Sequence, residues 1–141
     1  VDRVVNDFGA TAVNIDEIYD LDVDVYAPCA LGATVNDETI PRLKAQIIAG
    51  CANNQLAESR HGEILREKGV LYAPDYVINA GGIINVYYET KPEGYNVQAA
   101  TKHVEGIFDT LIEIFQRSDA EQVSTHVVAD ELAEEIIANG L

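Results

Sequence analysis

Three short apolar runs of β-type character alternate with helical segments in the first half of the chain, and this alternation limits the fold more than any other feature. The runs are Val23–Ala27, Ala45–Ala49 and Val70–Ala73, and the third can extend through Tyr76–Ile78. A helical pattern separates each run from the next. Strands that alternate with helices form βαβ units, in which the strands are parallel. The sequence therefore predicts an α/β fold.

Capping and turn-forming residues mark the ends of several expected helices. Pro41 lies in the first turn of a short helix at Glu38–Lys44, where proline is tolerated, and Gly69 ends a helix at Glu58–Lys68. After Gly82 the apolar spacing becomes helical. The other expected elements are a helix at Val1–Phe8, a short strand at Ala10–Val13, a break at Lys91–Gly94, and helices at Ile83–Glu89, Val97–Phe115 and Ser124–Ala138.

Small polar or glycine-bearing segments follow all three apolar runs, at residues 27–32, 50–55 and 79–82. In open parallel sheets, ligands bind outside the carboxyl ends of the strands. In the third segment, Gly81-Gly82 predicts a sharp turn whose bare N–H groups open a helix and favour negative charge or a carbonyl dipole. Asn79 is polar, and Ile83 and Val86 share one helix face. Together they can hold an amphipathic small molecule, although the same residues can also form a simple turn and core.

Composition excludes several classes of partner. The net charge is −15, from 24 acidic and 9 basic residues, which argues against binding to nucleic acid or anionic membranes. No apolar run approaches the roughly 18 residues that span a bilayer, and no secretory signal opens the chain. Cys29 and Cys51 form no CxxC motif, which indicates reduced thiols in a cytoplasmic protein. The three histidines are far apart in sequence and predict no metal site.

The chain lacks the motifs that would carry a complete reaction. No phosphate-binding glycine loop and no G-x-S-x-G motif occurs, and the lysines fall in helical, exposed segments. Asp75 is the one acid that stands out, and a turn-forming role suits it better than that of a general base. We therefore assign no catalytic residue. The chain also has no methionine and begins at Val1, which indicates a piece of a longer polypeptide.

Four segments resemble the glutamate/leucine/phenylalanine/valine dehydrogenase superfamily, and within it the leucine dehydrogenases. They are D24-V-Y-A-P-C-A-L-G32, I47-I-A-G-C-A-N-N-Q-L56, R60-H-G62 and Y72-A-P-D-Y-V-I-N-A-G-G-I-I-N-V86. The resemblance continues through the final helix and implies the second half of a Rossmann-type parallel sheet followed by C-terminal helices. It divides the chain into a partial NAD-binding domain, residues 1–90, and helices that pack back on the cleft, residues 91–141.

The resemblance also implies site residues. Cys29, Ala30 and Leu31 would lie beside the nicotinamide ribose of NAD, and Asn54 near the nicotinamide. Asn79 would serve both cofactor and substrate. Ile83 and Val86 would line the substrate side-chain pocket, where two aliphatic residues suit leucine, isoleucine or valine. The site residues that the resemblance implies are therefore Cys29, Ala30, Leu31, Asn54, Asn79, Ile83 and Val86.

The leading hypothesis is therefore the C-terminal part of an NAD-dependent branched-chain L-amino-acid dehydrogenase, which converts its substrate to a 2-oxo acid and ammonia. The full-length protein is expected to be a cytoplasmic homo-oligomer, and the 141-residue chain alone is expected to be inactive. A relative that prefers phenylalanine, tryptophan or valine is one alternative. A non-catalytic module for assembly or binding is the other.

Overall fold

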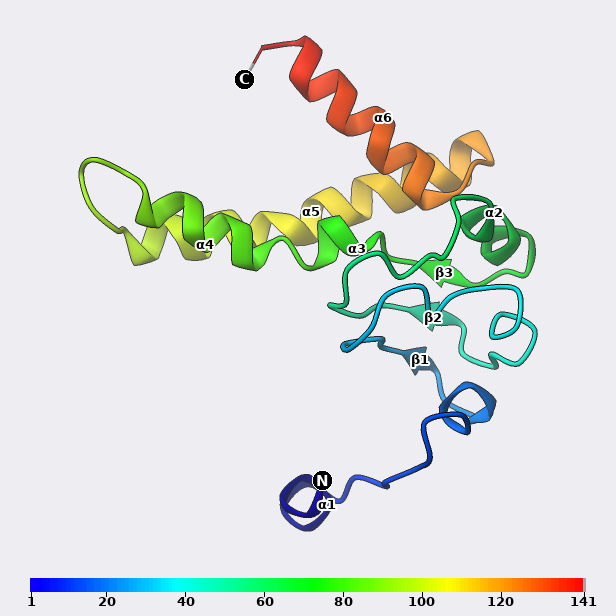
Figure 1. The fold of residues 1–141 in the computed structure, drawn as a ribbon. Helices are drawn as coiled ribbons and strands as arrows, with labels where there is room; N and C mark the ends of the chain where they lie inside the picture. The colour runs from blue at the N-terminus through cyan, green and yellow to red at the C-terminus, as the bar shows by residue number, and fades with distance from the viewer. Residues whose placement is uncertain (141) are drawn as a thin grey trace.

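A computed structural model describes residues 1–140, which form a small parallel sheet and several helices, some of which extend away from the sheet (Figure 1). The sheet has the order β1-β2-β3, with strands Val25–Tyr26, Ile47–Ile48 and Leu71–Tyr72. Each strand pairs in parallel with its neighbour. The predicted α/β class is therefore confirmed, although each strand is shorter than the apolar run that contains it.

Two expected strand segments are not strands. Residues Ala10–Val13 are exposed and pair with no other described segment, so the strand expected there is wrong. A strand needs a partner for its backbone N–H and C=O groups. The expected extension at Tyr76–Ile78 is also wrong, because these residues belong to helix α3, Asp75–Ile78. The amides of the last two residues of α3 donate to the Pro74 carbonyl and close the helical turn.

The short helix expected at Glu38–Lys44 is replaced by consecutive turns. Pro41 has no N–H to donate and so interrupts the helical hydrogen bonds. The Asn36 side chain accepts the amides of Glu38 and Thr39 at 2.9 and 3.0 Å, which stabilises the turn instead. The segment still buries Ile40 against the sheet.

The other expected helices are confirmed within two residues at most ends, while the long fifth helix continues six residues further than expected. Gly9 (φ 68°) ends the first helix, and Gly69 (φ 75°) follows the second. The break expected at Lys91–Gly94 lies in the loop between α4 and α5, and the division into two domains at residue 90 stays a prediction. The helices are α1 Asp2–Phe8, η1 Ile18–Asp20, α2 Arg60–Glu67, α4 Gly81–Glu89, α5 Val97–Glu121 and α6 Thr125–Ala138.

Two apolar clusters hold these elements together. The larger surrounds the sheet and is centred on Ile48 and Leu65, both fully buried. The smaller joins α5 to α6 through Ile114 and Val128, and Val77 of α3 packs against it. Because α3 follows β3 directly, the second cluster connects the helical part of the chain to the sheet.

The start of α6 docks on α2 and β3 through close contacts. The Thr125 hydroxyl donates to the Tyr72 carbonyl at 2.7 Å, and Ser59 Oγ lies 2.9 Å from His126 Nε2. The His126 ring rests directly on Gly62, where an added Cβ would overlap ring atoms. Burial lowers the pKa of His126, which favours the neutral ring at this junction.

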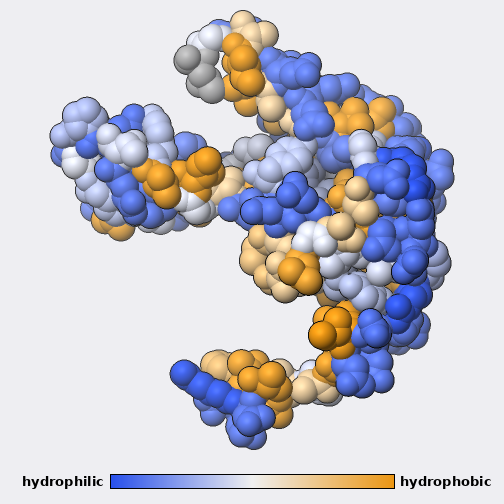
Figure 2. Space-filling model, in the orientation of Figure 1, coloured by the Kyte–Doolittle hydropathy of each residue, from blue (hydrophilic) through white to orange (hydrophobic). Residues whose placement is uncertain are grey.

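Apolar side chains remain exposed on the segments that project from the sheet (Figure 2). Helix α1 buries none of its residues, and Phe8 is 77% exposed. Phe108 of α5 and Ile137 of α6 are similarly exposed. Within residues 1–140, no helix combines the length and apolar character needed to cross a membrane.

The contact between α2 and α6 can be tested with matched glycine substitutions. We expect Gly62→Ala to lower the free energy of unfolding by about 1–3 kcal/mol, because the new methyl group would overlap His126. Gly106→Ala is the control: Gly106 lies inside α5 with open space at its Cβ position, so alanine should add up to about 1 kcal/mol of stability. Urea denaturation measures the free energy of unfolding of both variants. Equal changes in the two variants would contradict the close contact between Gly62 and His126.

Candidate functional site

The first two strand-end segments pack closely against each other. The amide of Ala52 donates to the Pro28 carbonyl at 2.9 Å. Gly50 lies so close to Pro28 that an added Cβ would overlap its backbone, and the same holds for Gly32 against the Asn53 carbonyl. Side chains at these glycines would separate the segments, so the glycines permit the close approach.

Asn79 attaches the third segment to the second. Its Nδ2 group donates to the Cys51 carbonyl at 3.2 Å and to Asn53 Oδ1 at 2.6 Å. Asn79 follows the last residue of α3, so its position depends on that helix. The three segments expected at the carboxyl edge of the sheet therefore come together.

A buried carboxylate organises this edge. Asp75 Oδ2 accepts the amide of Gln55 at 2.7 Å and the Tyr72 hydroxyl at 3.3 Å. The Gln55 side chain in turn donates to the carbonyls of Gly50 and Ala52 at 2.7 and 2.9 Å. Burial, with the nearby Asp75 charge, raises the pKa of Tyr72 well above its usual range, so the phenol stays protonated as a donor. The expectation that Asp75 has a local structural role is consistent with these contacts.

An open groove of about 530 Å³ lies where the second and third segments meet α4. Asn53 and Asn79 supply polar groups, and the Ile83 side chain, 73% exposed, supplies an apolar wall. The remaining lining residues are Cys51, Tyr76 and Ala80. The groove thus combines amide groups with an aliphatic surface, which suits an amphipathic ligand.

The sharp turn expected at Gly81-Gly82 is wrong. Both glycines form the first turn of α4, and neither has a positive φ. The chain needs no sharp reversal there because α3 ends close by, at Ile78, and Ala80, which precedes the glycines, already has helical backbone angles. The first amides of a helix have no partner within that helix, so α4 still begins at the groove with N–H groups available.

The residues predicted for the site divide between the groove and its surroundings. Asn79 and Ile83 line the groove, whereas Val86, 54% exposed, lies further along α4 and outside the lining. Asn54 adopts a left-handed conformation (φ 54°), and its carbonyl accepts the Ala33 amide at 2.7 Å. Cys29, Ala30 and Leu31 are exposed on the first segment and do not line the groove.

Sequence reasoning missed Asn53 and Tyr76. The sequence N53-N54 offered two equivalent amides, and only the fold distinguishes the one that bonds Asn79. Tyr76 was assigned to a strand, but in α3 its hydroxyl donates to the His126 carbonyl at 3.1 Å and to Asp130 at 2.6 Å. Burial and the Asp130 carboxylate raise the pKa of Tyr76, which keeps it protonated.

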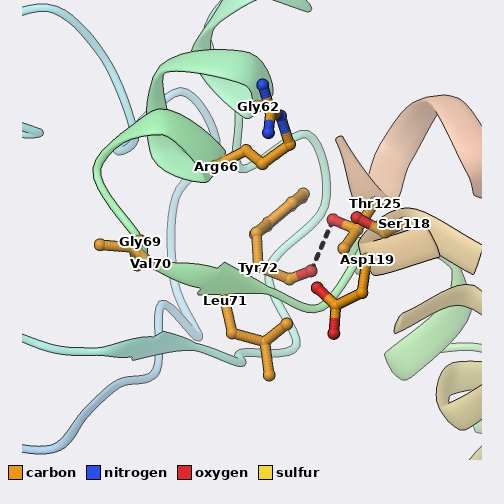
Figure 3. Close-up of a pocket in the computed structure, with 9 residues that line it drawn as sticks. All are labelled: Gly62, Arg66, Gly69, Val70, Leu71, Tyr72, Ser118, Asp119 and Thr125. Atoms are coloured by element: carbon orange, nitrogen blue, oxygen red, sulfur yellow. Dashed lines mark hydrogen bonds between the residues drawn. The ribbon is translucent and has the colours of Figure 1, made fainter. Parts of the chain in front are cut away.

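A second, smaller hollow of about 170 Å³ lies between α2, β3, the end of α5 and the start of α6 (Figure 3). Most of its polar side chains already have partners: Thr125 donates to the Tyr72 carbonyl, Ser118 donates to the Val123 carbonyl, and Arg66 pairs with Glu63. The first bond joins α6 to β3, the second closes the end of α5, and the third lies within α2. This hollow is therefore a packing feature of the fold.

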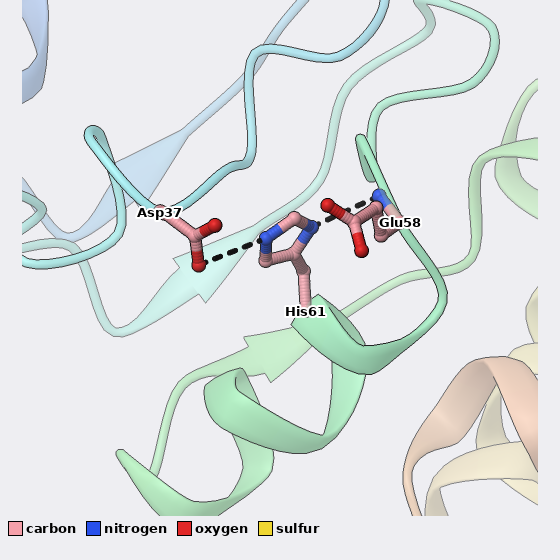
Figure 4. A group of neighbouring side chains, drawn as sticks. All are labelled: Asp37, Glu58 and His61. Carbon is pink, nitrogen blue, oxygen red and sulfur yellow. Dashed lines mark hydrogen bonds and ion pairs between the residues drawn. The ribbon is translucent and has the colours of Figure 1, made fainter.

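Asp37, Glu58 and His61 cluster at the start of α2 (Figure 4). His61 Nδ1 accepts the Glu58 amide at 2.9 Å, so Nε2 carries the proton and donates to Asp37 at 3.3 Å. Both ring nitrogens are thereby used, and no lone pair remains for a metal ion. Arg60 pairs with both carboxylates and lowers the pKa of Asp37 to about 2. The cluster acts as an ion-pair network at a helix start.

Comparison with known families matches residues 2–137 to the model for Glutamate/Leucine/Phenylalanine/Valine dehydrogenase. The chain belongs to this family. Leucine dehydrogenase from Bacillus cereus is 59% identical over 139 residues, which are 99% of the chain and 37% of that protein. L-tryptophan dehydrogenase from Nostoc punctiforme is 55% identical over 133 residues, 94% of the chain and 37% of that protein.

The crystal structure of the Nostoc punctiforme L-tryptophan dehydrogenase has the same fold, with a TM-score of 0.93 and 52% identity over 98% of the chain and 41% of that structure. This member of the dehydrogenase family therefore spans about two fifths of the length of the relatives it matches. The resemblance expected from the four sequence segments is confirmed.

The organising role of Asp75 can be tested by two substitutions in this dehydrogenase segment. Asp75→Ala removes the acceptor of the buried Gln55 amide, and we expect the free energy of unfolding to fall by about 1–3 kcal/mol. Asp75→Asn keeps one acceptor oxygen, so its free energy of unfolding should fall less. Urea denaturation measures both, with Asp22→Ala as an exposed control. The role is contradicted if Asp75→Ala and Asp22→Ala are equally stable.

Proposed function

We propose that the chain is the C-terminal part of an NAD-dependent L-amino-acid dehydrogenase that prefers branched aliphatic substrates, releasing a 2-oxo acid and ammonia. The observation that carries the proposal is the groove where Asn79 bonds both Cys51 and Asn53 beside the exposed Ile83. Membership of the dehydrogenase family supports the same activity.

The groove fits the nicotinamide end of NAD. A carboxamide needs both donors and acceptors, and the asparagine amides and the first amides of α4 supply them. A flat aromatic ring also needs an apolar wall, which Ala80 and Ile83 provide. In this proposal Cys29, Ala30, Leu31, Asn54 and Asn79 hold the cofactor, which supplies the hydride acceptor when bound. The segments that carry these residues pack on one another, which supports the assignment.

Ile83, with Val86, selects the substrate side chain in this proposal. Both are exposed on α4 and share one side of the helix. Aliphatic residues exclude polar side chains strongly, but they separate similar apolar substrates by only about 1–3 kcal/mol per methylene. The chain is similar to both a leucine dehydrogenase and a tryptophan dehydrogenase. This similarity is consistent with a pocket whose size depends on only a few residues.

We also propose that residues 1–90 belong to the cofactor domain and residues 91–141 to helices that pack across the cleft. The exposed apolar side chains of α1, α5 and α6 suit burial against the rest of a longer protein or a second copy in a homo-oligomer. Two free thiols suit a cytoplasmic location.

The 141-residue chain should not catalyse the reaction by itself. The side chains that line the groove include no carboxylate, lysine or histidine that could transfer a proton during deamination. We expect the isolated chain to form no NADH from L-leucine at saturating NAD, whereas the full-length protein should form it. The absorbance of NADH measures both reactions. Turnover by the isolated chain would show that this division of roles is wrong.

The selective role of Ile83 can be tested in the full-length protein. We expect Ile83→Ala to lower kcat/KM for L-leucine relative to L-phenylalanine by about tenfold or more, because the smaller residue enlarges the pocket. Ile112→Ala, at a half-exposed aliphatic position on α5 away from the groove, is the control and should leave the ratio unchanged. An unchanged ratio of kcat/KM values in Ile83→Ala would show that Ile83 does not line the substrate pocket.

A further inference from the structure

The two cysteines lie at matching positions on neighbouring strands. The register pairs Val25 with Ile47 and Tyr26 with Ile48. Cys29 and Cys51 are separated by the same number of residues as the members of each of these pairs. The pairing continues one step beyond the strands, since Ala49 donates to the Tyr26 carbonyl at 3.0 Å. The two segments then stay in contact through the Ala52 amide, which donates to the Pro28 carbonyl one residue later than a regular ladder would place the bond. β1 and β2 lie directly side by side in the sheet (Figure 1).

The burial pattern places both cysteines on the same side of the paired segments. Tyr26 and Ile48 are buried, and so are Pro28 and Gly50, two residues further on. Cys29 and Cys51 alternate with these positions, and both thiols are free and exposed. The Cys29 thiol lies close enough to the Cys51 thiol to raise the pKa of Cys51. The two sulfur atoms are therefore neighbours.

Neighbouring strands are separated by roughly 4.8 Å, and a disulfide needs Cα atoms about 4.4–6.8 Å apart. From this geometry we propose that Cys29 and Cys51 form a reversible intramolecular disulfide, which makes the strand ends a thiol redox site. The partner reagent is a small-molecule disulfide such as oxidised glutathione.

The reaction is a thiol–disulfide exchange in two steps. The Cys29 thiolate attacks one sulfur of the external disulfide, forms a mixed disulfide and releases one thiol. The Cys51 thiolate then attacks the Cys29 sulfur and releases the second thiol. Two cysteine thiols are oxidised, one external disulfide is reduced to two thiols, and the two cysteine protons pass to the released thiolates.

The bond would also regulate the neighbouring groove, a consequence that rests on the proposed function. It would join the first strand-end segment to the second, and Asn79 is bonded to the carbonyl of Cys51 itself. The bond would use the thiol of Cys51, which lines the groove, and would hold the Cys29 side chain beside it. We expect the oxidised protein to bind NAD roughly fivefold or more weakly than the reduced protein, within the usual range for coupled sites.

Peptide mapping of the full-length protein tests the bond. Trypsin cleavage after Arg42 and Lys44 separates Cys29, in residues 4–42, from Cys51, in residues 45–60. After incubation with oxidised glutathione, we expect these two peptides to be linked, and dithiothreitol to separate them. In Cys51→Ser, Cys29 should retain glutathione as a mixed disulfide. The proposal would be overturned if the wild-type protein gave no linked peptides. In that case it would either retain glutathione on one of the cysteines or keep both thiols free.

NAD binding to the same samples, measured by calorimetry, tests the regulation separately. Weaker binding in the oxidised wild type, restored by dithiothreitol to the affinity of protein that was never oxidised, supports it. Equal affinity in linked and reduced protein contradicts the regulation. Absence of NAD binding in both forms contradicts the proposed function, while the linked peptides still decide whether the disulfide forms.

Discussion

The buried carboxylate of Asp75 is the interaction on which the strand-end region depends. It accepts the Gln55 amide, and the Gln55 side chain then holds the carbonyls of Gly50 and Ala52. Asp75 also opens helix α3, whose end places Asn79. One carboxylate therefore holds the second segment through Gln55 and positions the third through helix α3. A charge in a buried position is tolerated because backbone and phenol donors satisfy it.

The sheet itself is small, and the helices supply much of the packing around it. Strands of two residues provide few hydrogen bonds, so the apolar cluster around Ile48 and Leu65 stabilises the sheet more than its ladder does. The junction of His126 with Gly62 then fixes the C-terminal helices on this unit. The groove is built on the same framework, because α3 packs on α5 and its Asp75 bonds Gln55 and Tyr72 at the sheet edge.

The sequence predicted what local rules control. Alternating apolar runs gave the parallel sheet, and glycines after helices gave their ends, as at Gly69. It failed where tertiary contacts decide. Tyr76 has strand character by composition, but the Pro74 carbonyl and a bond to Asp130 make it helical. Gly81-Gly82 suggested a turn because glycine is flexible, whereas the preceding helix had already set the chain direction. The choice between neighbouring asparagines needed the fold itself.

Two adjacent isoleucines on α4 have opposite environments. Ile84 is buried beneath the helix, whereas Ile83 is 73% exposed in the groove. A substitution at Ile83 therefore changes the surface offered to a ligand without leaving a cavity in the core. Under the proposed function, mutations that alter ligand preference can accumulate there with little selection against unfolding. Helix α4 would then separate the evolution of specificity from the maintenance of stability, one residue apart.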